Sequence, residues 1–149
     1  MTTIADLIYS NTANAKGIPN SPTQPQLANL AWLTMRVDMT KKLLAAYNPH
    51  LTSGFRSKAL SVAVGGNEHD EHTDGRAFDL DCHLGDADAH LIPARLVFDN
   101  RHIFGGSLHQ VIAERGHVHC GFYSIGKVGP CELRVSRAGH YPLLDLKPW

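Results

Sequence analysis

The chain has 149 residues, of which 43% are hydrophobic and 19% charged, and these proportions exclude a disordered, collagen-like or coiled-coil protein. A chain of this length buries roughly two thirds of its unfolded surface, so residues 1–149 are predicted to form a single domain. Fourteen basic residues balance fourteen acidic ones, and this lack of net charge disfavours nucleic acid or an anionic membrane as a partner.

Targeting signals are not apparent in the sequence. No stretch approaches the ~18 apolar residues that a membrane-spanning helix requires. The first ten residues show neither a basic start nor an apolar signal core. We therefore expect a protein that is synthesised in the cytoplasm without a signal peptide and does not use a membrane as a partner.

The first part of the chain is predicted to be helical. Residues 3–15 carry an apolar stripe that predicts a short helix, and Gly17 is placed to end it. Thr23 stands three residues before Gln26, which is the pattern of a capping box. Apolar residues at helical spacing follow, so a long core helix is predicted to end near residue 47.

The middle of the chain alternates between strands and helices. Residues 50–55 are predicted to form a short strand that places Arg56 at its end. A helix capped by a serine is expected over 57–64, and a polar loop over 67–75. Residues 77–82 are predicted to form a buried strand, because apolar side chains there alternate with two aspartates.

The last third of the chain is predicted to contain most of the sheet. A helix is expected to begin at Pro93 and to end near residue 100, because a proline is tolerated in a first turn. Residues 110–114 and 117–123 are predicted to form two strands around a tight turn, and 132–136 a final strand. This order of elements favours an α+β fold, in which a small antiparallel sheet has helices packed on one face.

A set of histidines and one aspartate indicates a metal site. His72 lies on the predicted loop and Asp79 on the next strand, with Gly75 allowing a sharp turn between them. His117 and His119 are two residues apart, so both side chains project from one face of a strand and can approach the first pair. Nitrogen and oxygen ligands are typical of a catalytic zinc site, and the three cysteines show no C-x-x-C pair.

The order of several short motifs resembles one known family over nearly the whole chain. These motifs are Thr12-Ala13, Gly17-Ile-Pro-Asn-Ser-Pro22, Ser53-Gly-Phe-Arg-Ser57, Val64-Gly-Gly66, His72 with Gly75, Ala77 and Asp79, Gln110-Val-Ile-Ala-Glu114, and His117-Val-His119. Together they resemble the M15 family of zinc peptidases, subfamily A, which contains peptidoglycan D-Ala-D-Ala carboxypeptidases and phage endolysins. The resemblance implies the Hedgehog/DD-peptidase-like variety of the α+β fold.

The resemblance also implies a role for each candidate site residue. His72, Asp79 and His119 would be the ligands of a zinc ion. Arg56 would bind a carboxylate of the substrate, for which a guanidinium is well suited. His117 would stabilise the oxyanion that forms during hydrolysis.

Two positions depart from the family pattern. Asp70 stands where the family has a serine, two residues before the first ligand, and Gly116 stands where many relatives have a carboxylate. Glu114 is therefore the candidate general base. Alternatively, Glu114 and His117 form an E-x-x-H element, and His117 is the third ligand instead of His119. The better match of the surrounding strand favours His119.

The remaining histidines are interpreted as residues that do not bind the metal. They are His50, His69, His83, His90, His102, His109 and His140.

The family resemblance leads to a specific functional hypothesis. We expect a monomeric zinc peptidase that hydrolyses peptidoglycan stem peptides, as an endopeptidase or a D,D-carboxypeptidase. A phage or prophage endolysin, released to the cell wall in the periplasm after synthesis, fits the missing signal peptide. The alternative is a non-catalytic cell-wall-binding or virion-structural module that keeps the fold. A metal-dependent nuclease is disfavoured, because no basic stripe is present.

Overall fold

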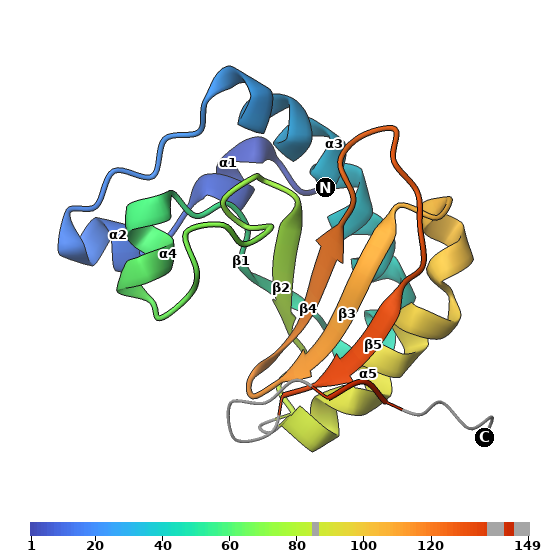
Figure 1. The fold of residues 1–149 in the computed structure, drawn as a ribbon. Helices are drawn as coiled ribbons and strands as arrows, with labels where there is room; N and C mark the ends of the chain where they lie inside the picture. Colours follow the sequence, from blue (N-terminus) through green and yellow to red (C-terminus); the bar gives the residue numbers. More distant parts are fainter. Residues whose placement is uncertain (85–86, 137–141, 145–149) are drawn as a thin grey trace.

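The computed structural model describes residues 1–84, 87–136 and 142–144, and its centre is a five-stranded sheet (Figure 1). The strand order across the sheet is β1-β2-β4-β3-β5. The strands are β1 His50–Ser53, β2 Ala77–Asp81, β3 Leu108–Glu114, β4 His117–Phe122 and β5 Glu132–Val135. Neighbouring strands are antiparallel except β3 and β5, which are parallel. The predicted α+β class is therefore confirmed, with one parallel pair in a mostly antiparallel sheet.

Five α-helices and two short 3₁₀ helices accompany the sheet in the described residues. They are α1 Ile4–Ile8, α2 Asn11–Lys16, α3 Gln24–Leu43, η1 Ala45–Tyr47, α4 Lys58–Ala63, α5 Ala87–Asp99 and η2 Arg101–Phe104. None of these helices has the length and apolar character needed to span a membrane.

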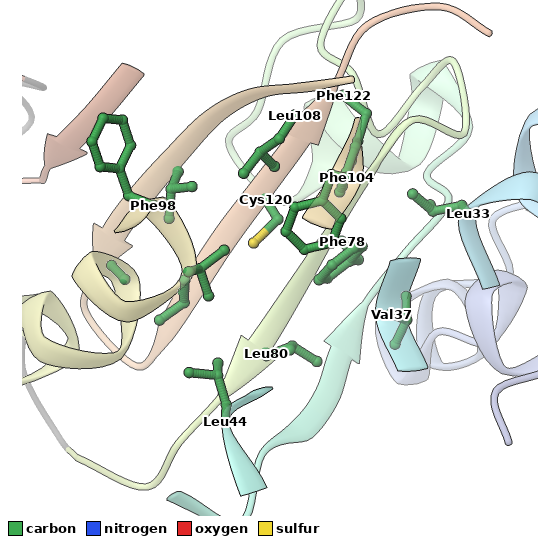
Figure 2. Close-up of a cluster of buried hydrophobic side chains, with 14 of the residues drawn as sticks. Leu33, Val37, Leu44, Phe78, Leu80, Phe98, Phe104, Leu108, Cys120 and Phe122 are labelled. Atoms are coloured by element: carbon green, nitrogen blue, oxygen red, sulfur yellow. The ribbon is translucent and has the colours of Figure 1, made fainter. Parts of the chain in front are cut away.

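Helices α3 and α5 cover one face of the sheet and form the core with it (Figure 2). Leu33 and Val37 of α3 face Phe78 and Leu80 of β2, and all four side chains are fully buried. The core continues with Cys120 and Phe122 of β4, Phe98 of α5 and Phe104 of η2. Because neighbouring strand residues point to opposite faces, the polar residues between these core positions are directed to the other side of the sheet.

Two predicted helices differ from those in the structure. Residues 3–15 form two helices instead of one, because the Ser10 hydroxyl accepts a hydrogen bond from the Ala13 N–H at 3.2 Å and so caps a new helix. Pro93 does not begin its helix but lies inside α5. Burial of Ala94 and Val97 against the sheet outweighs the backbone hydrogen bond that the proline removes.

The other predicted elements are confirmed. Thr23 and Gln26 form the capping box of α3, and Ser57 caps α4 by accepting a hydrogen bond from the Leu60 N–H. Gly17 and Gly116 adopt left-handed φ angles of 63° and 90°, the first ending α2 and the second closing the turn between β3 and β4.

Candidate metal centre

Two of the predicted ligands lie opposite each other in the sheet. In the antiparallel pair of β2 and β4, Asp79 is the direct partner of His119. Directly opposite side chains in such a pair project from the same face with Cβ atoms about 5 Å apart. The core residues Val118 and Cys120 flank His119, so His119 points to the face that α3 and α5 leave uncovered.

The third predicted ligand, His72, comes from the loop before β2. Its Nδ1 lies 2.6 Å from the carbonyl oxygen of Gly54, and the Arg56 N–H donates to the His72 carbonyl at 3.2 Å. A carbonyl only accepts hydrogen bonds, so Nδ1 carries a proton, and Nε2 is the ring nitrogen that remains to bind a metal. The loop contact therefore presents His72 as a metal ligand through Nε2.

The three side chains converge on one point. His72 Nε2 is 3.2 Å from His119 Nδ1 and 3.2 Å from Asp79 Oδ1, and His119 Nδ1 is 2.9 Å from Asp79 Oδ1. Ligand bonds of 2.0–2.1 Å at tetrahedral angles separate ligand atoms by about 3.3 Å. All three residues are buried, and among the described residues they form the one group of histidine, cysteine, aspartate or glutamate side chains that could hold a metal ion. The donor set and the spacing therefore fit a tetrahedral cation with one position open to the cavity.

His117 is close to this group but lies further from it than His119. Its Nε2 is 3.7 Å from Asp79 Oδ1 and 3.8 Å from Glu114 Oε2. Glu114 and His117 are direct partners across the turn between β3 and β4. The sequence left His119 and His117 as alternatives for the third ligand. The distances favour His119, and His117 and Glu114 lie beside the centre.

Arg56 reaches the centre through Asp79. One guanidinium nitrogen, Nη2, donates to Asp79 Oδ2 at 2.5 Å, while Nε donates to the Ser53 hydroxyl at 2.9 Å. Asp79 is thus shared, with Oδ1 toward the two imidazoles and Oδ2 toward the guanidinium. The sequence placed Arg56 at the end of a strand, but its contact with a ligand carboxylate was not anticipated.

The electrostatics of the centre favour a bound cation. Burial by itself raises the pKa of Asp79, but the charge and hydrogen bonds of His72 and His119 outweigh it and hold that pKa well below its usual range. Burial lowers the pKa of His119, and its contact with Asp79 and the charges of Glu71 and Glu114 raise it above the ordinary value. Asp79 is therefore ionised at neutral pH and supplies negative charge where a metal would lie.

The centre forms the floor of an open cavity of about 720 Å³. Arg56, Glu114 and His117 line this cavity together with the three metal-binding candidates. The N-terminal segment contributes Tyr9, and α4 contributes Leu60. All six residues predicted for the site are therefore in one cavity, whereas their individual roles stay predictions.

The structure adds two acidic residues to the site. Asp70, the departure from the family serine, accepts hydrogen bonds from the Ser61 hydroxyl at 2.8 Å and the Thr73 N–H at 3.0 Å, so it ties the ligand loop to α4. Glu71 also lines the cavity but was not selected from the sequence, although its position next to His72 was a usable signal. The non-ligand histidines lie outside the metal group in the described residues, and His140 falls outside those residues.

The family profile described as Peptidase M15 matches residues 2–120 of the chain. A comparison with curated proteins gave no significant match. The matched region begins before α1, ends within β4 and contains all three candidate ligands. The chain therefore belongs to the Peptidase M15 family.

Proposed function

We propose that this member of the Peptidase M15 family is a zinc-dependent peptidase that hydrolyses peptidoglycan stem peptides. The observation that carries the proposal is the convergence of His72, Asp79 and His119 to within 2.9–3.2 Å on the floor of an open cavity. Two imidazoles, one carboxylate and one open position are the composition of a catalytic zinc site, whereas structural sites use mostly cysteines.

The metal would supply the general chemistry of hydrolysis. A zinc ion held there lowers the pKa of water to about 7 and polarises a carbonyl oxygen. His72 would bind through Nε2, His119 through Nδ1 and Asp79 through Oδ1, because these atoms converge.

Three other residues would act directly on the substrate. Glu114 accepts the proton of the attacking water and passes it to the leaving amine, as a general base and then a general acid. His117, whose Nε2 is 3.8 Å from Glu114, donates a hydrogen bond to the developing oxyanion. Arg56 presents its guanidinium to a substrate carboxylate while it holds Asp79.

The biological setting belongs to the same proposal. The protein acts as a monomeric phage or prophage endolysin on the cell wall, with the stem peptide as its partner and no role for nucleic acid or membrane. The balance of fourteen basic and fourteen acidic residues supports the exclusion of polyanions.

A non-catalytic wall-binding or virion-structural module is the second candidate function. The observation that favours it is Gly116 at the position where many relatives carry a carboxylate. Glu114 argues against the binding module, because it lines the cavity and is the direct strand partner of His117, two residues before the candidate ligand His119.

Digestion of purified cell walls separates the two functions. We expect the zinc-loaded protein to release peptides from sacculi, with products identified by mass spectrometry, and the activity to be lost with a chelator and restored by zinc. His119→Ala is the matched inactive control. Binding to sacculi without release of any peptide, across several cross-link types, would establish the binding module instead.

A further inference from the structure

Glu71 has a fixed position in the cavity. His109 Nδ1 lies 2.9 Å from its Oε1, and the Gln110 side-chain amide donates to its Oε2 at 2.8 Å. Both partners come from β3, while Glu71 itself belongs to the ligand loop. The side chain is 17% exposed and lines the same cavity as the metal centre. Two hydrogen bonds therefore hold this carboxylate in one orientation at the cavity wall.

The strand register gives the place of Glu71 relative to the metal centre. A Cβ on Gly121 would lie 3.3 Å from Glu71 Cδ and 3.1 Å from Gln110 Cγ, so the two side chains cover this glycine. His117, His119 and Gly121 share one face of β4 at two-residue steps of about 7 Å. Glu71 therefore lies one step from the metal centre, on the side opposite Glu114 and His117.

The charge of Glu71 is not neutralised by a permanent cation. Within the described part of the chain, His109 is the one basic side chain within 4.0 Å of a Glu71 oxygen. The two arginines that line the cavity are bound to other carboxylates, Arg56 to Asp79 and Arg134 to Glu132. An oriented carboxylate in a substrate cavity favours a positively charged group of the ligand.

We propose that Glu71 is a specificity-determining residue that binds an ammonium group of the substrate peptide, one two-residue step along β4 from the metal centre. The inference rests on the proposed peptidase function and names a chemical feature of its substrate. The ammonium can be the α-amino group of a short peptide or the side-chain amine of a diamino acid. Either group donates hydrogen bonds to a carboxylate in the same way.

The test compares three peptides that differ only in which amine is acetylated and therefore uncharged. One has both amines free, one is acetylated at the α-amine and one at the side-chain amine of the residue next to the scissile bond. kcat and KM are measured for zinc-loaded wild type, Glu71→Gln and Glu68→Gln. Glu68 is an exposed glutamate on the same loop that does not line the cavity, so its variant is the matched control for charge.

We expect wild type to prefer the peptide whose recognised amine is free by roughly 10- to 100-fold in kcat/KM. Glu71→Gln should lose this preference, mainly through a higher KM, while its zinc content by elemental analysis stays at the wild-type value. Glu68→Gln should keep the preference. The amine whose acetylation lowers the kcat/KM of wild type is the amine that Glu71 binds.

Two results would overturn the inference. One is equal kcat/KM of wild type for all three peptides. The other is a Glu71→Gln variant that is slowed equally on all of them, which would make Glu71 part of the general machinery. Calorimetric binding of the same peptides to the zinc-loaded protein gives a readout without turnover. Failure of wild type to cleave any peptide refutes the proposed function, whereas binding without ammonium preference refutes this inference alone.

Discussion

At the scale of single residues, the metal centre depends on how each ligand is oriented. Gly54 accepts the Nδ1–H of His72, and Arg56 holds the far oxygen of Asp79. These outer contacts leave His72 Nε2 and Asp79 Oδ1 directed at His119. Such supporting contacts typically change metal affinity by about 10- to 100-fold when removed. The candidate site is therefore a property of five residues, of which three would hold the metal.

The first prediction concerns the identity of the ligands. His72→Ala and His119→Ala should each lose bound zinc, because the remaining two ligands hold the ion weakly. His117→Ala should retain about one zinc per chain, because its Nε2 lies outside the converging group. Elemental analysis after dialysis measures the result. Retention of zinc by His119→Ala together with its loss from His117→Ala would show that His117 is the third ligand.

A second prediction assigns the general base. Glu114→Ala should lower kcat by roughly two to four orders of magnitude while zinc stays bound, because the residue acts on the transition state and is not a ligand. Peptide release from muropeptides and zinc content are measured on the same sample. An active Glu114→Ala variant would move the role to another carboxylate of the cavity, with Asp70 the next to be replaced; Asp81, the other candidate from the sequence, does not line the cavity.

A third prediction concerns Arg56, which has two partners. Arg56→Lys keeps the charge but not the two-point geometry, so the contact with Asp79 survives better than recognition of a substrate carboxylate. We expect kcat/KM to fall by roughly one to two orders of magnitude with zinc retained. Unchanged kinetics would show that Arg56 does not bind substrate, and loss of zinc would show that it acts only through Asp79.

At the scale of elements, β4 shows why much of the site could be predicted. Its alternation of histidine with buried apolar residues directs His117 and His119 to one face, and sequence periodicity alone reveals that. The pairing of His119 with Asp79 needed the strand register, which the sequence does not state. Pro93 shows the opposite case, because tertiary burial of α5 outweighed a local rule.

Some features of the site were beyond sequence reasoning because they join distant segments. Glu71 meets His109 and Gln110 across 38 and 39 residues, and no local pattern marks those contacts. The contact of Arg56 with Asp79 spans 23 residues and depends on how β1 pairs with β2. Motif spacing found the side chains that carry the chemistry, whereas the partners that orient them follow from the fold.

A fourth prediction tests the coupling between α1 and the metal centre. A Cβ on Gly54 would lie 2.5 Å from the Leu7 carbonyl oxygen and 2.9 Å from Leu7 Cα, so Gly54→Ala must push α1 away from β1. The same glycine accepts the hydrogen bond of His72. We expect a loss of about 1–3 kcal/mol in the free energy of unfolding and a weaker zinc affinity. Denaturant titration and zinc competition measure the two effects, and an unchanged variant would contradict the coupling.

At the scale of the whole molecule, the two faces of the sheet have separate tasks. One face packs on α3 and α5 and supplies the stability of the core (Figure 2). The other face carries the centre, and α1, α2 and α4 lie beside it (Figure 1). Tyr9, Thr12 and Leu60 from these segments line the cavity. His72 comes from the loop after α4 while His119 comes from β4, so a bound metal would link the cavity wall to the sheet.

The last prediction follows from this link. A metal that binds only the folded state stabilises it by RT ln(1 + [M]/Kd), which is about 4 kcal/mol at a thousandfold excess over Kd. For a chain of this size, 1 kcal/mol corresponds to roughly 2–4 °C, so zinc should raise the Tm by roughly 8–16 °C over the chelated protein. Differential scanning calorimetry of wild type, His72→Ala and His102→Ala checks this. His102 is exposed and outside the centre, so its variant should keep the full shift, whereas His72→Ala should lose it. An equal shift in all three proteins would place the stabilising metal elsewhere, because His72 could then not be one of its ligands.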